Sequence, residues 1–276
     1  MRLVRPLLCA LAAITVAGCA SGPDAGTAVS STPVASPGAF KVCMVADEAG
    51  FSDGGINQLA YTGMMAAATD LKLLVGQAQA DAQTDYAASI ASLAAAQCTL
   101  IITVGQQHAG DAQAAAQANS GVKFLLVDAQ PAEPRANLKP LLFDLADAAF
   151  LAGYVAAAQT QTGTVAEPTG ADEPYRNGFA AGVDYFNQAK GAAVAVVPDA
   201  AASTDGVRKV VDAAVISAIG EAARGQFTSS PYYGTLKDGG VDIAPLDASA
   251  GDELKAEVEA VRAALINGSV TPPAAG

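Results

Sequence analysis

Short apolar runs alternate with longer alanine-rich segments along the chain from residue 41 onward. The apolar runs, which we expect to be strands, cover residues 41–46, 71–78, 99–105 and 123–129. The segments with helical periodicity between and after them cover residues 56–70, 85–97 and 109–120. Continuous apolar runs between helices of this length are typical of parallel strands that helices cover on both faces. The pattern therefore predicts an α/β fold with a doubly wound parallel sheet.

The second half of the chain repeats this theme with fewer strands. Residues 141–163 begin with a short apolar run and continue as a helix, and residues 164–200 predict a strand, a loop, a helix and a strand. Two further helices are predicted over residues 206–225 and 253–269, and glycine follows the first of them.

The N-terminus has the pattern of an export signal. Arg2 and Arg5 precede an apolar stretch that is too short to span a bilayer comfortably and is closed by small residues. Residues 16–19 read VAGC, which resembles a bacterial lipobox, so we expect residues 1–18 to be a lipoprotein signal peptide and Cys19 to carry the lipid that anchors the protein in the membrane. The alternative is ordinary export with cleavage nearby. Residues 19–38 contain almost only small, polar, Pro and Gly residues and predict a flexible tether.

Charge and composition narrow the range of partners. The formal net charge of the 276 residues is −12, and loss of the signal peptide with its two arginines makes it two units more negative. An acidic chain argues against a nucleic-acid partner. Tryptophan is absent and aromatic residues make up 5% of the chain, which favours alanine-rich helices packed on a sheet over an aromatic-rich binding platform.

Two cysteines remain after the signal and the lipid site are set aside. Cys43 and Cys98 each lie at or near the start of a predicted strand. Outside the cytoplasm they would form a disulfide if the two strands are neighbours, and otherwise they would be two buried thiols.

The positions of polar residues indicate binding rather than catalysis. Asp47, the loop after Gly105, and Asp128 all follow predicted strands, and ligands of doubly wound sheets bind beyond the carboxyl ends of the strands. The one histidine, His108, has no second histidine, no G-x-S-x-G motif and no C-x-x-C motif to complete a triad or a zinc site. We therefore expect no enzyme activity, no metal and no cofactor.

Eight segments in the same order carry a resemblance to a known family. They are VADEAGFSDGGINQLAYTGMMAA, GQQHAGDA, FLLVDA, AAFLAGYVAAAQTQTG, YRNGFAAGVDYFN, STDGVRKVVDAAV, YYGTLKDGGVDIAP and LKAEVEAVRAALINGSV. Together they span nearly all of residues 40–270 and resemble the basic membrane protein family of ABC-transporter substrate-binding lipoproteins. The resemblance implies a type I periplasmic-binding-protein-like fold of two α/β lobes joined by a hinge, an ABC permease as partner, and a purine nucleoside as the small-molecule ligand.

The resemblance also implies a set of ligand-binding residues. By position, Asp47 matches an acid that binds ribose hydroxyls, Asn57 an amide at a helix start, Asp111 an acid after the third strand, and Lys209 a lysine before a helix. Each residue has a structural alternative. The two acids and Asn57 could cap helices, and Lys209 could be a solvated surface charge.

Three departures from the family pattern accompany this resemblance. Ile56 replaces an aromatic residue that would stack on a base, and Glu48 stands where a neutral residue is usual. A strand–helix–strand segment is missing before the lysine motif. We therefore expect a first lobe, with hinge and C-terminal segments, from residues 39–160 and 206–276, and a reduced second lobe from residues 161–205. The expected function is nucleoside-type solute binding at the cell membrane, and the alternative is a ligand-free surface lipoprotein that serves as a scaffold or sensor partner.

Overall fold

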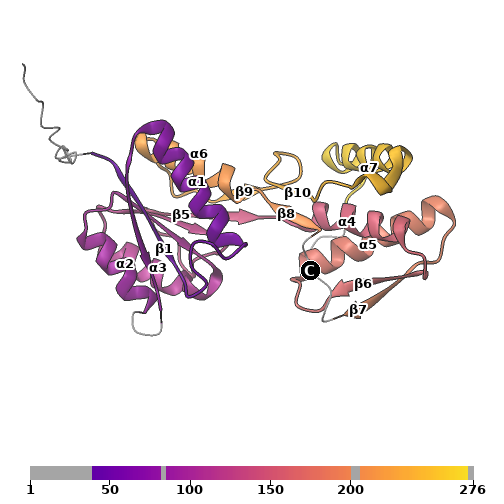
Figure 1. Ribbon diagram of the computed structural model, residues 1–276, viewed down its shortest axis with the longest axis horizontal. Helices are drawn as coiled ribbons and strands as arrows, with labels where there is room; N and C mark the ends of the chain where they lie inside the picture. Colours follow the sequence, from indigo (N-terminus) through magenta and orange to yellow (C-terminus); the bar gives the residue numbers. More distant parts are fainter. Residues whose placement is uncertain (1–38, 82–84, 200–205, 273–276) are drawn as a thin grey trace, which may run out of the picture. The chain divides into compact units, whose positions relative to one another are not determined.

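The computed structural model describes residues 39–81, 85–199 and 206–272 (Figure 1). The predicted signal peptide, the predicted tether and Cys19 lie outside these ranges. Within them, no helix combines the length and apolar character that crossing a bilayer requires.

Six parallel strands form the main sheet. In spatial order they are β2 (Leu74–Gln79), β1 (Lys41–Ala46), β3 (Leu100–Val104), β4 (Lys123–Val127), β5 (Leu138–Phe143) and β9 (Tyr232–Gly234). Every adjacent pair runs parallel. The predicted α/β fold with a parallel sheet is therefore confirmed.

Two helices cover each face of this sheet. Helices α1 (Ile56–Leu71) and α6 (Val211–Ala223) pack on the face that carries Val42 and Met44. Helices α2 (Tyr86–Ala95) and α3 (Ala109–Ala118) pack on the face that carries Cys43 and Val45. Because side chains alternate along a strand, a strand buried on both faces must be apolar throughout, as β1 is from its second residue onward.

A disulfide joins Cys43 on β1 to Cys98, which lies just before β3. Their Cα atoms are 6.0 Å apart, within the range that a disulfide spans. Since β1 and β3 are neighbours, the bonded alternative of the two that the sequence left open is the one in the structure. Closing a loop of 55 residues in the unfolded chain stabilises the fold by on the order of 4 kcal/mol in the chain-entropy model.

A second group of elements, which we call the second lobe, packs around helix α4. It comprises α4 (Ala146–Gln159), β6 (Thr164–Pro168), α5 (Glu173–Lys190), β7 (Ala195–Asp199), the 3-10 turn η2 (Ala248–Ala250) and α7 (Gly251–Ile266). Strands β6 and β7 form a two-stranded parallel sheet. Strands β8 (Val207–Lys209) and β10 (Val241–Ile243) form a separate antiparallel pair, which we call the hinge ribbon.

The structure differs from the sequence-based prediction in the lobe boundaries and in the type of one element. Helices α4 and α7 share apolar cores with α5 and the hinge ribbon instead of covering the six-stranded sheet, so residues 146–160 and the C-terminal helix belong with the second lobe. The segment from residue 206, which the periodicity predicted as helix, begins as strand β8 because it pairs with β10, a partner that lies more than 30 residues away in sequence.

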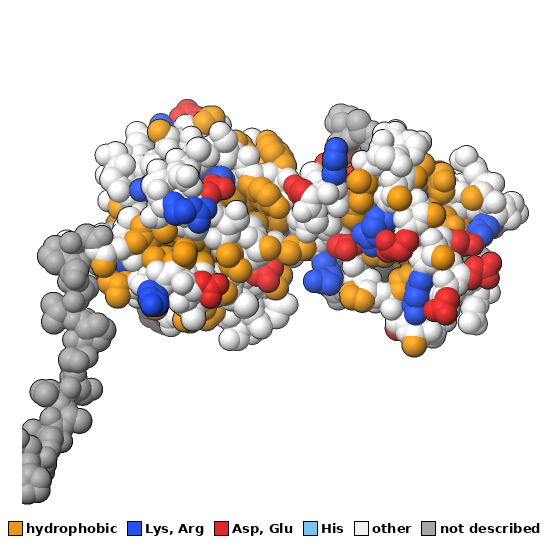
Figure 2. Space-filling view, turned by 90° about the horizontal axis from the view of Figure 1, so that it is seen from above, with side chains coloured by type: hydrophobic (Ala, Val, Ile, Leu, Met, Phe, Trp, Pro, Cys, Tyr) orange, Lys and Arg blue, Asp and Glu red, His pale blue; other side chains and the backbone are white. Residues whose placement is uncertain are grey.

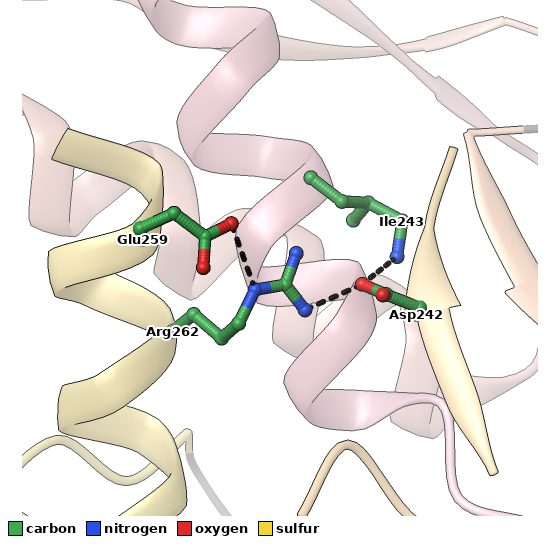
Figure 3. A network of polar contacts seen from close by, with 4 residues as sticks. All are labelled: Asp242, Ile243, Glu259 and Arg262. Atoms are coloured by element: carbon green, nitrogen blue, oxygen red, sulfur yellow. Dashed lines mark hydrogen bonds and ion pairs between the residues drawn. The ribbon is translucent and has the colours of Figure 1, made fainter. Parts of the chain in front are cut away.

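An ion-pair network ties the hinge ribbon to the last helix (Figure 3). Arg262 on α7 donates to Asp242 on β10 and to Glu259 one turn earlier on its own helix. The Asp242 carboxylate also accepts the backbone N–H of Ile243. Burial acts to lower the pKa of Arg262, yet the bonds to the two carboxylates raise this pKa overall, so the guanidinium stays charged.

On the face seen in Figure 2, basic and acidic side chains are interleaved and do not form separate patches of one sign.

Helix α1 begins on a carboxylate-centred turn. The Oδ1 atom of Asp53 accepts the backbone N–H groups of Gly55 and Gln58 at 2.8 and 3.0 Å, and its Oδ2 atom accepts from the Asn57 side chain at 3.1 Å. Burial acts to raise the pKa of Asp53, but these hydrogen bonds to the charged form lower it overall. The ionised form of Asp53 therefore stabilises the first turn of α1.

The α4–α5 crossing generates the first prediction. A Cβ atom added at Gly182 would lie 2.0 Å from the carbonyl oxygen of Phe150, so Gly182→Ala forces the two helices apart. We expect a destabilisation of about 1–3 kcal/mol despite the higher helix propensity of alanine. Denaturant unfolding followed by circular dichroism measures it. Gly110→Ala is the matched control, because no atom lies within 4 Å of its added Cβ. Equal stability of the two variants would contradict this account of the packing.

The Asp53 turn generates the second prediction. Because the pKa of Asp53 is lower in the folded state, its contribution to stability is present above the unfolded pKa of about 3.9 and is lost as pH falls through the folded pKa. Asp53→Ala should cost about 1 kcal/mol at pH 7, similar to the loss of a capping side chain, and less in acid that protonates Asp53 in the folded protein. Thermal unfolding of both proteins at pH 7 and in acid tests this. Asp70→Ala, which removes an exposed carboxylate at the other end of the same helix, is the matched control. A difference for Asp53→Ala that persists unchanged at low pH would refute the assignment.

Candidate functional site

Two hollows lie at the carboxyl ends of strands of the six-stranded sheet. The first, of about 510 Å³, is called the aromatic hollow and is lined by Asp47, Glu48, Ala49, Ala80, Asp81, Asp85, Tyr86, Gln107 and His108. The second, of about 470 Å³, is called the lysine hollow and is lined by Gly54, Gly55, Ile56, Leu59, Asp128, Leu145 and residues 207–212. This edge is where ligands bind to parallel α/β sheets.

Asp47 and Asn57 are hydrogen-bonded to each other. Asp47 directly follows β1, and its Oδ1 atom accepts from the Asn57 side chain and from the backbone of Ala49, both at 3.0 Å. The second amide hydrogen of Asn57 is donated to Asp53. Both hydrogens of this buried amide are thus used to hold the loop between β1 and α1. Among the described residues, the Oδ2 atom of Asp47 has no hydrogen-bond donor.

Lys209 reaches the end of β4 from the hinge ribbon. Its ammonium group contacts both carboxylate oxygens of Asp128, at 2.8 and 2.7 Å. Both side chains are about 30% exposed, so the pair lies at the surface of the lysine hollow rather than in a core. Asp128 adopts a left-handed backbone conformation with φ of 55°, which Asp tolerates better than most residues. The turn aims its carboxylate at the ribbon.

Asp111 lies on α3, the helix that follows strand β3. It is in the first turn of α3, and its carboxylate is 3.8 Å from Nδ1 of His108. His108 in turn stacks on Tyr86, with ring centroids 3.6 Å apart and planes 8° apart. Burial raises the pKa of Tyr86, and the charges of Asp47 and Asp111 raise it further, so both acids lie close enough to interact electrostatically with this tyrosine.

The predicted ligand residues therefore fall into two sets. Asp47 and Asn57 contact each other, and Asp47 and Asp111 both lie around Tyr86. Lys209 lines the other hollow. The loop from Asp53 to Asn57 connects the two, because Asn57 binds Asp47 while Gly55 and Ile56 line the lysine hollow.

Some residues of the site were not assigned from the sequence. Asp128 is visible in the sequence as an acid that follows a strand, but its pairing with Lys209 spans 81 positions and only the fold reveals it. Tyr86 gives no signal in the sequence beyond being the first residue of a helix. Of the two substituted positions, Ile56 lines the lysine hollow and Glu48 the aromatic hollow. In the described part of the chain, no group of His, Cys, Asp and Glu side chains is arranged to hold a metal ion.

The sequence of the chain matches a known protein family. Residues 40–204, more than half of the chain, match the family Bmp, described as "ABC transporter substrate-binding protein PnrA-like". The chain is 28% identical over 154 residues to Basic membrane protein A of Borreliella afzelii, in a match that covers 54% of this chain and 47% of that protein. The chain thus spans about half the length of the curated relatives it matches.

Solved structures are similar in fold. A solute-binding protein of an ABC transporter system from Aeropyrum pernix has a TM-score of 0.67 and 19% identity, over 85% of this chain and 94% of that one. A transcriptional activator of the comK gene from Bacillus halodurans has a TM-score of 0.68 and 16% identity, over 85% and 100%. The fold is that of the periplasmic-binding-protein-like solute-binding proteins, as predicted from the sequence. With its α/β lobes, its strand-end hollows and this match, the chain belongs to the family of PnrA-like ABC-transporter substrate-binding proteins.

Proposed function

We propose that this protein is the lipid-anchored, extracytoplasmic receptor of an ABC importer, and that its small-molecule ligand is a nucleoside, of the purine class. The observation that carries the ligand assignment is the carboxylate of Asp47. One of its oxygens is held by the loop and the other has no donor among the described residues. A fixed carboxylate with an open oxygen is suited to accept hydrogen bonds from vicinal ribose hydroxyls.

The remaining predicted residues complete the proposed site. Asp111 lies near the same region, and the Lys209–Asp128 pair in the lysine hollow offers both a donor and an acceptor to a polar group of the ligand. Asn57 acts through Asp47, whose orientation it fixes, because its own donors are already used.

We propose that binding is weak. Ile56 lines the lysine hollow where the family has an aromatic residue, and an aromatic stack contributes about 0.5–1.5 kcal/mol beyond area burial. The second lobe has two parallel strands in its described part, so one wall of the cleft is reduced. Since every ~1.4 kcal/mol changes affinity tenfold, we expect a dissociation constant in the micromolar range or above.

One observation favours the alternative of a ligand-free scaffold or sensor partner. Apart from one oxygen of Asp47, the polar groups of the site pair with one another without a ligand: Asn57 uses both amide hydrogens on acids, and Asp128 neutralises Lys209. A lipoprotein of this kind would keep the fold but bind nothing small in it. The ligand experiment below separates the two functions.

The third prediction is a stabilisation by nucleosides. A ligand that binds only the folded state raises the unfolding midpoint by mass action. We expect millimolar adenosine, guanosine or inosine to raise the thermal midpoint of the mature protein, and Asp47→Ala to abolish the rise. Asp47→Asn keeps an acceptor for Asn57. If the rise is lost in this variant too, the loss does not come from a collapsed loop. Asp70→Ala is the control for a carboxylate lost elsewhere. No shift with any nucleoside would favour the scaffold, and an undiminished shift in Asp47→Ala would remove Asp47 from the site.

The fourth prediction concerns the anchor. If Cys19 carries the lipid, Cys19→Ser should release the protein into the soluble extracytoplasmic fraction or leave it uncleaved, because the buried acyl methylenes supply the membrane affinity. Detergent-phase partitioning and the mass of the mature N-terminus measure this. A correctly cleaved variant that still partitions into detergent would show that the anchor lies elsewhere.

A further inference from the structure

The stacked rings of Tyr86 and His108 form one side of the aromatic hollow. The two rings are nearly parallel, with planes 8° apart and centroids 3.6 Å apart. The lower ring, Tyr86, is 5% exposed, and the side chain of His108 above it is 18% exposed and lines the hollow. A flat ring that is itself backed by a buried ring forms a rigid aromatic wall.

The wall is fixed to the sheet by hydrogen bonds. The Tyr86 hydroxyl donates to the carbonyl oxygen of Val45 at 3.2 Å and accepts the N–H of Val104 at 3.0 Å, so one oxygen bridges the carboxyl ends of β1 and β3. His108 ends the 3-10 turn η1 (Gln106–His108), which follows Gly105. Gln106 exchanges two hydrogen bonds with the backbone of Gln130, which ties this turn to the loop after β4. The rings therefore keep their place without a ligand.

Within the described residues, the ring of His108 makes no capping or other hydrogen bond. His108 is the N-cap residue of α3, yet its side chain makes no capping hydrogen bond. Its nearest carboxylate, Asp111, is 3.8 Å from Nδ1, which is beyond hydrogen-bond distance. The imidazole contributes a stacked surface to the hollow, and this is its main contact.

We infer that the Tyr86–His108 pair is the aromatic platform on which the base of the ligand stacks, an inference that rests on the proposed nucleoside function. It occupies the hollow that Asp47 lines, so one ligand can place its ribose at the carboxylate and its base at His108. The platform supplies an aromatic stacking surface in the aromatic hollow, whereas Ile56 in the lysine hollow supplies none. Offset stacking on such a ring selects aromatic heterocycles over sugars without a base.

The same hollow sets a preference against phosphorylated ligands. Asp47, Glu48 and Asp85 are among its lining residues, and no lysine or arginine is among them. A phosphate brought beside these carboxylates is repelled. We therefore expect a nucleoside monophosphate to bind this hollow more weakly than the uncharged nucleoside.

The test uses the untagged, full mature protein, because the chain has a single histidine and its imidazole protons give one assignable NMR signal. Titration with guanosine or adenosine should move the His108 Hε1 signal upfield through the ring current of the base. Ribose alone should not move it, and the monophosphate should require a higher concentration. Calorimetry should find His108→Ala about tenfold weaker for the nucleoside, and His108→Phe within about threefold of wild type.

Gln107→Ala is the matched control, because Gln107 belongs to the same turn and lines the same hollow without an aromatic ring. Circular dichroism and the thermal midpoint establish that each variant folds. Nucleoside binding that needs Asp47 but is unchanged in His108→Ala, with an unmoved His108 signal, overturns the platform and leaves the proposed function in place. A wild type that binds no nucleoside overturns both.

Discussion

The position of the site depends on the complete burial of strand β1. Its residues from Val42 to Ala46 are inaccessible to solvent, and it pairs with β2 on one side and β3 on the other. The Cys43–Cys98 disulfide joins its middle to the start of β3, and the Tyr86 hydroxyl bridges the far ends of the same two strands. A strand held in this way cannot slide without exposing apolar side chains on both faces. Asp47, the first residue after β1, is therefore held at a fixed position at the edge of the sheet.

The lysine of the proposed site is held by a different part of the fold. Lys209 lies on the hinge ribbon, whose other strand is tied to α7 by the Arg262–Asp242 ion pair. The ribbon also packs in the apolar core that α4 and α7 share. The ion pair of Lys209 with Asp128 therefore links the second lobe to the end of β4. Asp47 is fixed by the core of the six-stranded sheet, whereas Lys209 is fixed by the core of the second lobe. The position of one relative to the other therefore depends on the hinge ribbon.

The polar groups of the site are preorganised by one another. Asp53 holds the first turn of α1, Asn57 joins Asp53 to Asp47, and the tyrosine hydroxyl holds the ring pair. Preorganisation reduces the conformational cost of binding, whereas a carboxylate that already pairs with a lysine must exchange partners to meet a ligand. This balance agrees with the weak binding that we propose.

The sequence by itself determined the order and type of the main-sheet elements, because buried parallel strands are continuous apolar runs that can be read locally, as at 41–46 and 99–105. It also placed acids after strands β1 and β4, since strand ends follow from strand positions. It did not determine the lobe membership of α4, which depends on the close approach of its Gly153 to α5, nor the strand β8, which exists only through β10. The Lys209–Asp128 pair and the Tyr86–His108 stack likewise needed the tertiary structure. The reason is physical: periodicity records which residues are buried, whereas the partner of a polar or aromatic side chain is set by contacts between segments that are distant along the chain.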